Sequence, residues 1–301
     1  MNFVPTKCAI CGTSGDSEKV FDQNLDEDSF SAMVFSARRL PDRRSYQWVR
    51  CKNCGLLRSD PVFDADLKSL YGKSSFNYDS EVDGLKKVYA SITLRALKPN
   101  VAKGAILEVG GGNGFFLEVA KELGFYNVAG VEPSVEAVAA ARDDIKPFII
   151  VDMLRSRSVT PETFDVVAMF HVLDHLPNPK LILNICKSAL RPGGTFVVAV
   201  HDSRSWSAKL LKSRSPIIDL EHTYLYDKKT VRKLFEAAGL EDIRVGSYWN
   251  LYSLAYLIHL LPISNGVKIT ILKGRLGETL RKFRIYVPLG NLWASGVRPL
   301  K

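Results

Sequence analysis

The stretch A-I-L-E-V-G-G-G-N-G-F-F, residues 105–116, decides the fold class of this chain. It reads as an apolar strand that runs straight into a glycine loop and then into an amphipathic helix. Strand-like runs recur at 128–131, 148–151, 164–170 and 195–200, and helix-like runs lie at about 115–124, 134–143 and 179–190. Alternating strands and helices predict an α/β fold built on a doubly wound parallel sheet.

The glycine loop indicates a ligand site, because ligands of such sheets bind at the C-terminal ends of the strands. Gly110 and Gly112 let the backbone approach a ligand closely. Glu132 follows the next strand-like run, 22 residues after Gly110, and its carboxylate can hold both ribose hydroxyls of a nucleoside. These features alone fit either NAD or S-adenosylmethionine.

The residues around the loop distinguish the two cofactors. A dinucleotide fold requires a small residue at the last position of G-x-G-x-x-G, where the pyrophosphate meets the helix start. That position is Phe115 counted from Gly110, or Leu117 counted from Gly112. Glu108, just before the loop, also suits a cationic ligand better than a pyrophosphate. An NAD-dependent oxidoreductase is therefore the weaker alternative, and S-adenosylmethionine is the expected cofactor.

Taken in order, these motifs resemble the class I S-adenosylmethionine-dependent methyltransferases over about residues 75–250. The matching pieces are 108–114, Glu132, Asp152, 164–176 and 190–196. The resemblance implies a seven-stranded Rossmann-like sheet with a sixth strand at about 241–248 and a last, antiparallel strand at about 291–297. It also implies that Asp152 binds the adenine amine and that His171 lies in the cofactor pocket. Residues 164–176, which we call the fourth-strand motif, have Asp174 where the family usually has Glu.

Four of the five cysteines form two matched pairs in the spacing C-x2-C-x39-C-x2-C: Cys8 with Cys11, and Cys51 with Cys54. Four thiolates at this spacing suit a closed, tetrahedral zinc site, which leaves no open position for catalysis. Two disulfides or four idle thiols are the alternative. We therefore expect a structural zinc ribbon at 1–62 and a methyltransferase domain at 63–301.

Histidines mark the place where a base is expected. Methyl transfer to an oxygen or carbon acceptor needs a base, because alcohols and carbon acids are not ionised at neutral pH. Four of the five histidines stand at the ligand edge of the predicted sheet, at positions 171, 175, 201 and 222. We expect at least one of them to take part in the reaction.

The ribbon, the segment 70–80 and the pair Glu221–His222 together resemble the bacterial deoxysugar C-methyltransferases. This resemblance implies His222 as the base, Glu221 as the residue that orients or assists it, and His175 and Tyr78 as residues that hold the acceptor. Those enzymes continue into a large C-terminal domain, whereas this sequence ends at residue 301. The expected reaction is therefore methylation of a sugar hydroxyl in a nucleotide sugar, a glycan or a lipid-linked saccharide. Sugar C-methylation and an inactive zinc-ribbon binding module are the alternatives.

Composition and charge limit the classes of molecule that this protein is expected to bind. With 46% hydrophobic and 24% charged residues, the chain is an ordinary globular protein and not a disordered, collagen-like or coiled-coil one. Its net charge of +9 is compatible with an anionic small-molecule or glycan acceptor. Residues 268–301 hold eight basic side chains against one acid, Glu278. We find no nucleic-acid motif.

The segment 251–284 reads as an apolar helix followed by a basic one, and we expect it to form a helical cap. Its basic face is expected to contact an anionic acceptor or a membrane surface. The longest apolar run, 251–263, is shorter than the roughly 20 residues that a bilayer span needs. Without a signal-peptide core at the N-terminus, the expected location is the cytoplasm, with peripheral contact at the inner face of the membrane as an option.

Overall fold

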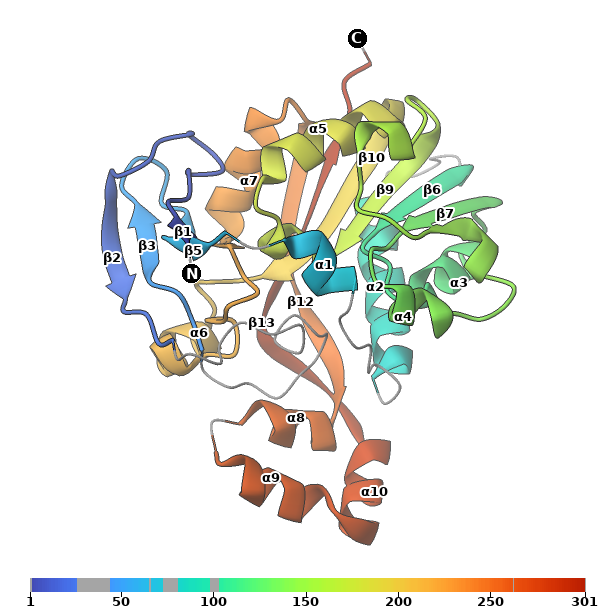
Figure 1. The fold of residues 1–301 in the computed structure, drawn as a ribbon. Coiled ribbons are helices and arrows are strands. Elements are labelled where there is room, and N and C mark those ends of the chain that lie inside the picture. Colours follow the sequence, from blue (N-terminus) through green and yellow to red (C-terminus); the bar gives the residue numbers. More distant parts are fainter. Residues whose placement is uncertain are drawn as a thin grey trace.

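A seven-stranded mixed sheet forms the centre of the molecule (Figure 1). The structure is a computed structural model that describes residues 2–25, 44–64, 66–72, 81–97, 103–261 and 263–300. In sheet order the strands are β12 (Glu241–Ser253), β13 (Arg284–Val297), β10 (Leu190–His201), β9 (Phe164–Phe170), β6 (Ala105–Val109), β7 (Asn127–Val131) and β8 (Ile149–Ile150). β13 runs antiparallel to both of its neighbours, and the other pairs are parallel. The predicted α/β methyltransferase sheet with an antiparallel last strand is confirmed.

Helices cover both faces of this sheet because the strands are apolar on both sides. In β6, Leu107 and Val109 face a core shared with α5 (Pro179–Ala189) and α7 (Lys228–Ala237). Ile106 faces the opposite core, which holds α2 (Val82–Ala96) and α3 (Phe115–Glu122). This alternation fixes the register of the strand, so the C-terminal ends of β6, β7, β9 and β10 meet at one edge of the sheet.

Side-chain caps start the helices that follow these strand ends. The Ser134 hydroxyl accepts a hydrogen bond from the N–H of Ala137 at the start of α4 (Val135–Ala139). The Asn178 side chain accepts one from the N–H of Leu181 in α5. Such caps satisfy backbone donors that have no partner within the helix. The turns at the ligand edge are therefore held by local bonds.

The two last strands are longer than the sequence predicted. β12 extends to Ser253 and β13 begins at Arg284, and the two remain paired through Asn250–Val287 and Ser253–Arg284. The predicted boundaries at 248 and 291 were wrong because the apolar run from 251 was interpreted as helix, whereas its first residues continue the β-ladder. Together these strands form an arm that projects from the sheet (Figure 1).

The arm carries three short helices at its end, which we call the tip, residues 254–283. They are α8 (Leu254–Leu260), α9 (Asn265–Leu272) and α10 (Gly274–Lys282). The sequence predicted one apolar and one basic helix at 251–284. The segment is helical but divided, because α9 ends at Leu272 and Gly274, with a φ of +71°, begins a new helix.

The ribbon at the N-terminus shares a sheet with the rest of the chain. β2 (Ser17–Phe21), β3 (Trp48–Cys51) and β4 (Leu57–Ser59) form three strands, and β11 (Tyr224–Leu225) is the fourth. A separate pair joins β1 (Phe3–Val4) to β5 (Val62–Phe63). Buried Trp48 and Leu57 pack with Ile218 and Leu225 in one cluster. The proposed division into 1–62 and 63–301 stays a prediction, since the core of the ribbon is completed by residues from beyond 200.

Two further short α-helices are α1 (Leu67–Gly72) and α6 (Trp206–Leu211). Within the part of the chain that the structure describes, no helix has both the length and the apolar character needed to cross a bilayer.

Candidate active site

One cavity of about 830 Å³ lies at the C-terminal edge of the central strands. It is lined by all of the described residues for which the sequence predicted a cofactor, acid–base or acceptor role: Glu108, Gly110, Gly112, Glu132, Asp152, His171, His175, Glu221 and His222. Tyr78, the remaining residue of the predicted acceptor site, lies outside the described residues. The linear order of motifs therefore identified one contiguous site, because parallel strands end at a common edge.

The glycine loop forms the floor of this cavity between β6 and α3. The N–H of Gly110 donates to the carbonyl of Val131 at the end of β7, over 2.8 Å. Gly110 has a φ of +73°, and a Cβ placed there would lie 2.4 Å from Cγ2 of Val172. Only glycine fits this backbone and this contact. The loop is thus held close to both neighbouring strand ends.

Glu132, directly after β7, connects the end of that strand to the glycine loop through hydrogen bonds. Its carboxylate accepts hydrogen bonds from the N–H of Gly112 at 2.9 Å and from the N–H of Ser134 at 2.8 Å. Each oxygen uses one lone pair in these bonds and keeps another, which is the arrangement that ribose hydroxyls require of a carboxylate. Asp152 lines the same cavity after β8, with one oxygen accepting from the N–H of Met153.

Glu108 is a buried carboxylate at the end of the cavity floor, only 2% exposed. Among the described residues, its Oε2 atom has no hydrogen-bond partner. Burial, and then the charge of nearby Glu132, raise the pKa of Glu108 well above its ordinary value. A cationic group placed here would pair with this oxygen and reverse that effect. The chemistry of the donor set therefore fits the positively charged part of S-adenosylmethionine.

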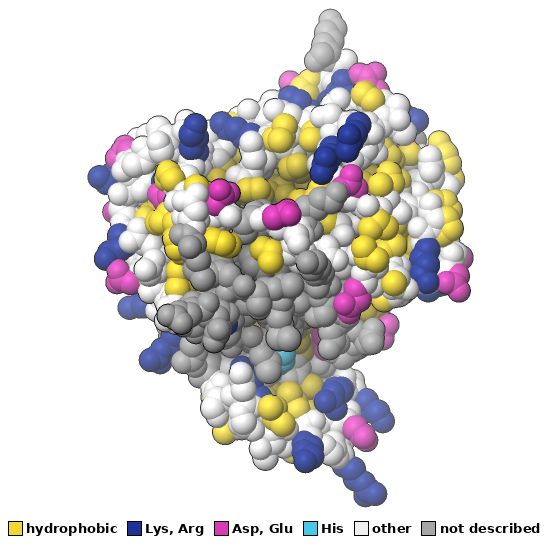
Figure 2. Space-filling model, viewed as in Figure 1, with side chains coloured by type: hydrophobic (Ala, Val, Ile, Leu, Met, Phe, Trp, Pro, Cys, Tyr) yellow, Lys and Arg dark blue, Asp and Glu magenta, His cyan; other side chains and the backbone are white. Residues whose placement is uncertain are grey.

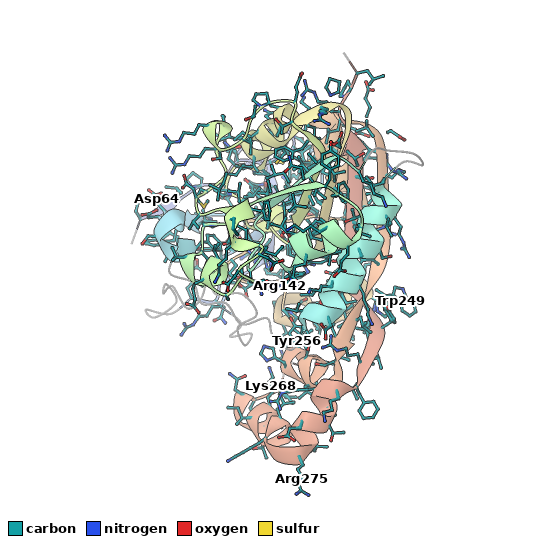
Figure 3. The ribbon with its side chains drawn as sticks, turned by 90° about the vertical axis from the view of Figure 1, so that its right-hand side faces the viewer. Asp64, Arg142, Trp249, Tyr256, Lys268 and Arg275 are labelled. Atoms are coloured by element: carbon teal, nitrogen blue, oxygen red, sulfur yellow. The ribbon has the colours of Figure 1, made fainter. Side chains whose placement is uncertain are left out.

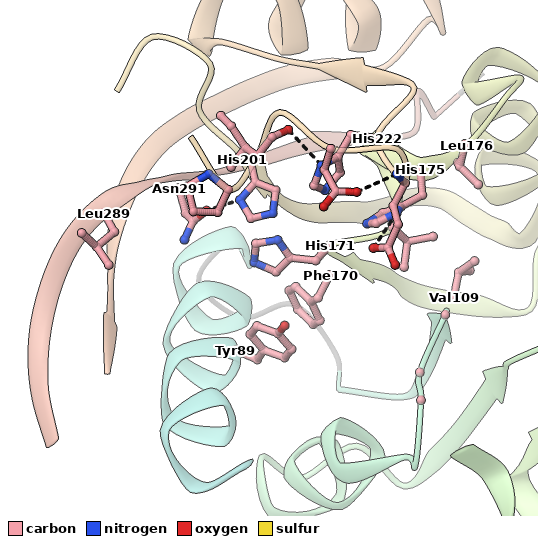
Figure 4. A pocket seen from close by; sticks show the side chains of 18 of the residues that line it. Tyr89, Val109, Phe170, His171, His175, Leu176, His201, His222, Leu289 and Asn291 are labelled. Atoms are coloured by element: carbon pink, nitrogen blue, oxygen red, sulfur yellow. Dashed lines mark hydrogen bonds and ion pairs between the residues drawn. The ribbon is translucent and has the colours of Figure 1, made fainter. Parts of the chain in front are cut away.

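Four imidazoles gather beside this floor (Figure 4). The ring centroids lie 4.7 Å apart for His171 and His201, 5.1 Å for His201 and His222, and 4.7 Å for His222 and His175. They come from the ends of β9 and β10 and from the loop before β11. The sequence placed all four at this edge, and the structure brings them into one continuous group.

Asp174 lies within this histidine group and is fully buried. One carboxylate oxygen is 3.9 Å from Nε2 of His175, and the other is 4.0 Å from Nε2 of His201. Its Oδ1 atom has no hydrogen-bond partner among the described residues. Sequence reasoning noted Asp174 only as a departure from Glu and did not place it in the site. Its position directly before His175 in the fourth-strand motif was the available signal.

His222 has a defined tautomer because a carbonyl can only accept a hydrogen bond. Its Nδ1 lies 3.0 Å from the carbonyl oxygen of Ile217, so Nδ1 carries the proton and Nε2 offers a lone pair. Burial, and then the neighbouring His175, lower the pKa of His222 well below its ordinary value of 6.5. The ring is therefore neutral at pH 7 and able to take up a proton.

The carboxylate of Glu221 lies beside the ring of His175. Its Oε2 lies 4.0 Å from Nδ1 of His175, and the orienting contact on the His222 ring comes from Ile217. The assignment of Glu221 as the partner of His222 stays a prediction. Tyr71 in α1, part of the same segment as the predicted Tyr78, places its hydroxyl 3.4 Å from Nδ1 of His175.

Two partners of the histidines come from the arm. The Tyr248 hydroxyl lies 2.8 Å from Nε2 of His171, and Oδ1 of Asn291 lies 2.8 Å from Nδ1 of His201. His171 has a φ of +55°, a conformation that non-glycine residues adopt at a cost of roughly 1–3 kcal/mol. Sequence reasoning missed Tyr248 and Asn291, because only the register of β12 and β13 brings them to this edge.

The far end of the cavity is apolar. The lining there comes from α6, from α8 and from the middle of β13: Trp206, Leu210, Leu211, Tyr256, Leu257, Leu260, Leu261, Val287, Pro288 and Leu289. Among the described lining residues, the charged side chains are the carboxylates of Glu108, Glu132, Asp152, Asp219 and Glu221. The cavity thus passes from an acidic floor, past the histidines, to a hydrocarbon wall.

The four ribbon cysteines form a second candidate site, and none of them lines this cavity. Their Sγ atoms all lie within 4.8 Å of one another, with 3.3 Å between Cys8 and Cys54 and 3.6 Å between Cys11 and Cys51. These separations exclude a disulfide, whose sulfur atoms are about 2.05 Å apart. They are close to the separation of about 3.8 Å that follows from tetrahedral Zn–S bonds of about 2.3 Å. The cysteines fit a structural zinc ion.

The ribbon also holds the loop that carries His222. The Ser59 hydroxyl donates to the carbonyl of His222 at 2.9 Å, and the Ser59 N–H donates to the carbonyl of Thr223 at 2.9 Å. The Thr223 N–H in turn donates to the carbonyl of Asp174 at 2.9 Å. The backbone of the candidate base is thus fixed between the ribbon and the fourth-strand motif.

Comparison with known families agrees with this geometry. Residues 79–245, more than half of the chain, match the family model described as a methyltransferase domain. This chain belongs to that family. The methyltransferase domain assignment supports S-adenosylmethionine as the cofactor and leaves the NAD-dependent alternative without support.

Individual relatives cover parts of the methyltransferase domain. A protein of Idiomarina loihiensis named ubiquinone biosynthesis O-methyltransferase is 28% identical over 155 residues, which are 46% of this chain and 63% of that protein. The protein of the same name from Xanthomonas campestris is 34% identical over 101 residues, 31% of this chain and 41% of that protein. The chain therefore spans less than two thirds of the length of these relatives.

Among solved structures, a chain from the complex between the Haloferax volcanii Trm112 methyltransferase activator and a methyltransferase shares the fold. It has a TM-score of 0.52 at 18% identity, and the match covers 79% of this chain and 100% of that one.

Proposed function

We propose that this protein transfers a methyl group from S-adenosylmethionine to a hydroxyl oxygen of an acceptor that has an uncharged polar head and an apolar body. The observation that carries the proposal is the layout of the cavity. The cofactor loop, the histidine group around Asp174 and the apolar wall follow one another along a single space. A hydroxyl held at the histidines would have its apolar body along α6, α8 and β13.

The cofactor end of the reaction rests on Glu108, Glu132, Asp152 and the glycine loop. Bound S-adenosylmethionine supplies an electrophilic methyl group on a sulfonium. The unpartnered Oε2 of Glu108 would pair with a positive charge, and Glu132 would hold the ribose hydroxyls through its remaining lone pairs. Asp152 would bind the adenine amine.

The acceptor end rests on His222. Its Nε2 would take the hydroxyl proton as the oxygen attacks, since the ring is neutral and its Nδ1–H is fixed by the Ile217 carbonyl. His175, which lies beside Tyr71 and Glu221, would form hydrogen bonds with the acceptor head and so position it. Most of the rate gain in such a displacement comes from holding the two reactants in line and excluding water.

Two kinds of hydroxyl fit this description. The sequence predicted a sugar hydroxyl, and the apolar wall favours a lipid-linked saccharide over a free nucleotide sugar. The relatives named for ubiquinone biosynthesis favour an aromatic hydroxyl on a molecule with an apolar tail. A phenol is the easier acceptor for a neutral imidazole, because its pKa of about 10 is well below that of an alcohol. An anionic head has less support, since carboxylates provide the charge among the described lining residues.

An acceptor panel tests the proposal. We would measure S-adenosylhomocysteine release with prenylated phenols, lipid-linked saccharides and free nucleotide sugars. Turnover with either apolar-tailed class, and little with free nucleotide sugars, is the expected result. Turnover confined to nucleotide sugars would contradict the assigned role of the apolar wall. NMR of the product would separate an O-methyl ether from the C-methylated sugar that the sequence left as the alternative.

A further inference from the structure

We infer that the tip, residues 254–283, is a membrane-docking element that seats on an anionic lipid bilayer and places the apolar end of the cavity at the bilayer surface. The first part, the docking surface, is argued from the exposed side chains of the tip alone. The second part, that the acceptor is drawn from the bilayer into the cavity, rests on the proposed function.

The first observation is the amount of apolar side chain that the tip exposes. Leu276 is 60% exposed, Phe283 61% and Ile269 60%. The tip and the adjoining part of β13 also expose Leu261, Ile263, Val267, Ile285 and Tyr286. Figure 2 shows apolar side chains gathered on the lobe below the main body. Such a concentration of exposed apolar side chains marks an interaction surface rather than the scattered apolar residues of an ordinary surface.

The second observation is the charge that surrounds these side chains. Lys273, Arg275, Arg281 and Lys282 are exposed on the tip, against a single acid, Glu278. In the described part of the chain, none of these four cations takes part in an ion pair with a carboxylate. Figure 3 shows Arg275 at the extreme end of the lobe, directed away from the body. Cations around an apolar surface complement anionic lipid headgroups over an acyl-chain boundary.

The third observation is the connection between the tip and the cavity. α8 and the residue after it belong to both, since Tyr256, Leu257, Leu260 and Leu261 line the cavity and Leu261 is also 47% exposed. Trp206 and Leu210, which line the same end of the cavity from α6, are 56% and 70% exposed. An apolar molecule could therefore pass from a surface under the tip to the histidines along a continuous apolar path.

The position of the tip favours a bilayer as the occupant. The arm holds the tip away from the main body, at the end of two long paired strands (Figure 1). This geometry lets a flat surface reach the apolar residues of the tip without contact with the central sheet. A second copy of the chain would have to bring four exposed cations against the same four, which is unfavourable without added acids.

Vesicle flotation of the intact protein tests the inference. We would compare vesicles of phosphatidylcholine alone with vesicles that contain about 30% phosphatidylglycerol, and we expect binding to the anionic ones that weakens with salt. The triple variant K273A/R275A/K282A should bind about a hundredfold more weakly, since each cation near an anionic surface is worth about fivefold. The variant L276S/F283S should also lose binding, even to anionic vesicles at low salt.

The matched control is K180A/K228A/K229A, which removes three lysines from α5 and α7, two helices of the main body and not of the tip (Figure 1). It should bind as the unchanged protein does. Equal loss in the control, or full binding by the tip variants, would overturn the inference, as would light scattering that shows a dimer formed through the tip in place of vesicle binding. Vesicle binding needs no turnover, so failure of the acceptor panel with intact vesicle binding would contradict the proposed function alone. Turnover on a detergent-dispersed acceptor without vesicle binding would contradict the docking alone.

Discussion

His222 is held by two hydrogen bonds, one to its ring and one to its backbone carbonyl. Ile217 fixes the ring through Nδ1, and Ser59 of the ribbon fixes the backbone carbonyl. The ring is 6% exposed, so little water reaches Nε2 in competition with an acceptor. For a base placed in this way, correct positioning contributes to the reaction rate in addition to its basicity.

Replacing His222 with alanine should lower kcat by about 10²–10⁴-fold, the usual contribution of a general base. The Kd for S-adenosylmethionine, measured by calorimetry, should be nearly unchanged, because the cofactor residues belong to the strand ends of β6, β7 and β8. Leu94→Ala is the control, since that side chain is exposed on α2 and is not among the cavity-lining residues. A variant at position 222 with ordinary turnover would exclude this residue as the base.

The acid side of the pH profile should also report His222. Burial lowers its pKa well below 6.5, so the ring stays neutral and basic as the pH falls through 6.5. The value of kcat/KM should therefore hold at pH 6.5 and decline only at a lower pH, where Nε2 is already protonated before the acceptor arrives. A profile that falls by half at pH 6.5 or above would indicate an ordinary exposed imidazole as the base.

Most residues of the candidate site could be predicted from the sequence, but Asp174, which lies within the histidine group, could not. Glu132 and Asp152 were found because each follows a predicted strand, and Glu108 because it lies at the end of the strand that leads into the glycine loop, and strand ends converge in this fold. Asp174 was noticed but not assigned, since its contacts with His175 and His201 depend on burial that spacing does not reveal. Tyr248 and Asn291 needed the register of two strands that lie 77 and 90 residues beyond their histidine partners.

Among the elements, β11 has only two residues and yet links two distant parts of the chain. Its two residues pair with Arg58 and Leu57 of β4 and so join the ribbon to the loop that carries His222. The four cysteines were read correctly as a cluster because C-x2-C knuckles are a local signal. The attachment of β11 was not predictable, because a two-residue strand has no periodicity of its own.

The variant Cys51→Ser tests this connection. Loss of one of four thiolates should reduce bound zinc from about one ion per chain to nearly none, measured by elemental analysis. Because β3 and β4 would lose their support, we expect kcat to fall as well, although none of the four cysteines lines the cavity. Cys186→Ala, which alters a fully buried core cysteine, should keep its zinc. A C51S protein with full zinc content would contradict the four-cysteine site, and one without zinc but with full activity would contradict the coupling to His222.

At the scale of the whole molecule, the cavity is a joint product of distant parts of the chain. Its floor comes from 108–112, its histidines from 171–222 and its apolar wall from 206–289. The α/β succession predicted the first two parts. For the wall, the sequence predicted a helical cap at 251–284, but it did not show that β13 starts at Arg284 and contributes Val287, Pro288 and Leu289.

A series of acceptors with increasing apolar length tests the role of this wall. Each buried CH₂ is worth about 0.8 kcal/mol, so KM should fall about fourfold per added CH₂ until the wall is covered. Leu257→Ala should flatten that dependence, whereas Leu94→Ala, an exposed change on α2, should not. If the KM values did not depend on length, the acceptor would have to lie elsewhere.

The shared sheet of the ribbon has a consequence for how the protein is made. Ser59 and His222 are 163 residues apart, so at about 5–20 residues per second the ribosome adds the partner strand of β4 roughly 10–30 s after β4 itself. During this interval Trp48 and Leu57 have no Ile218 or Leu225 to cover them. The ribbon is therefore synthesised well before the strand that completes its sheet, and neither its core nor the loop that carries His222 can be finished until residues 218–225 have left the ribosome.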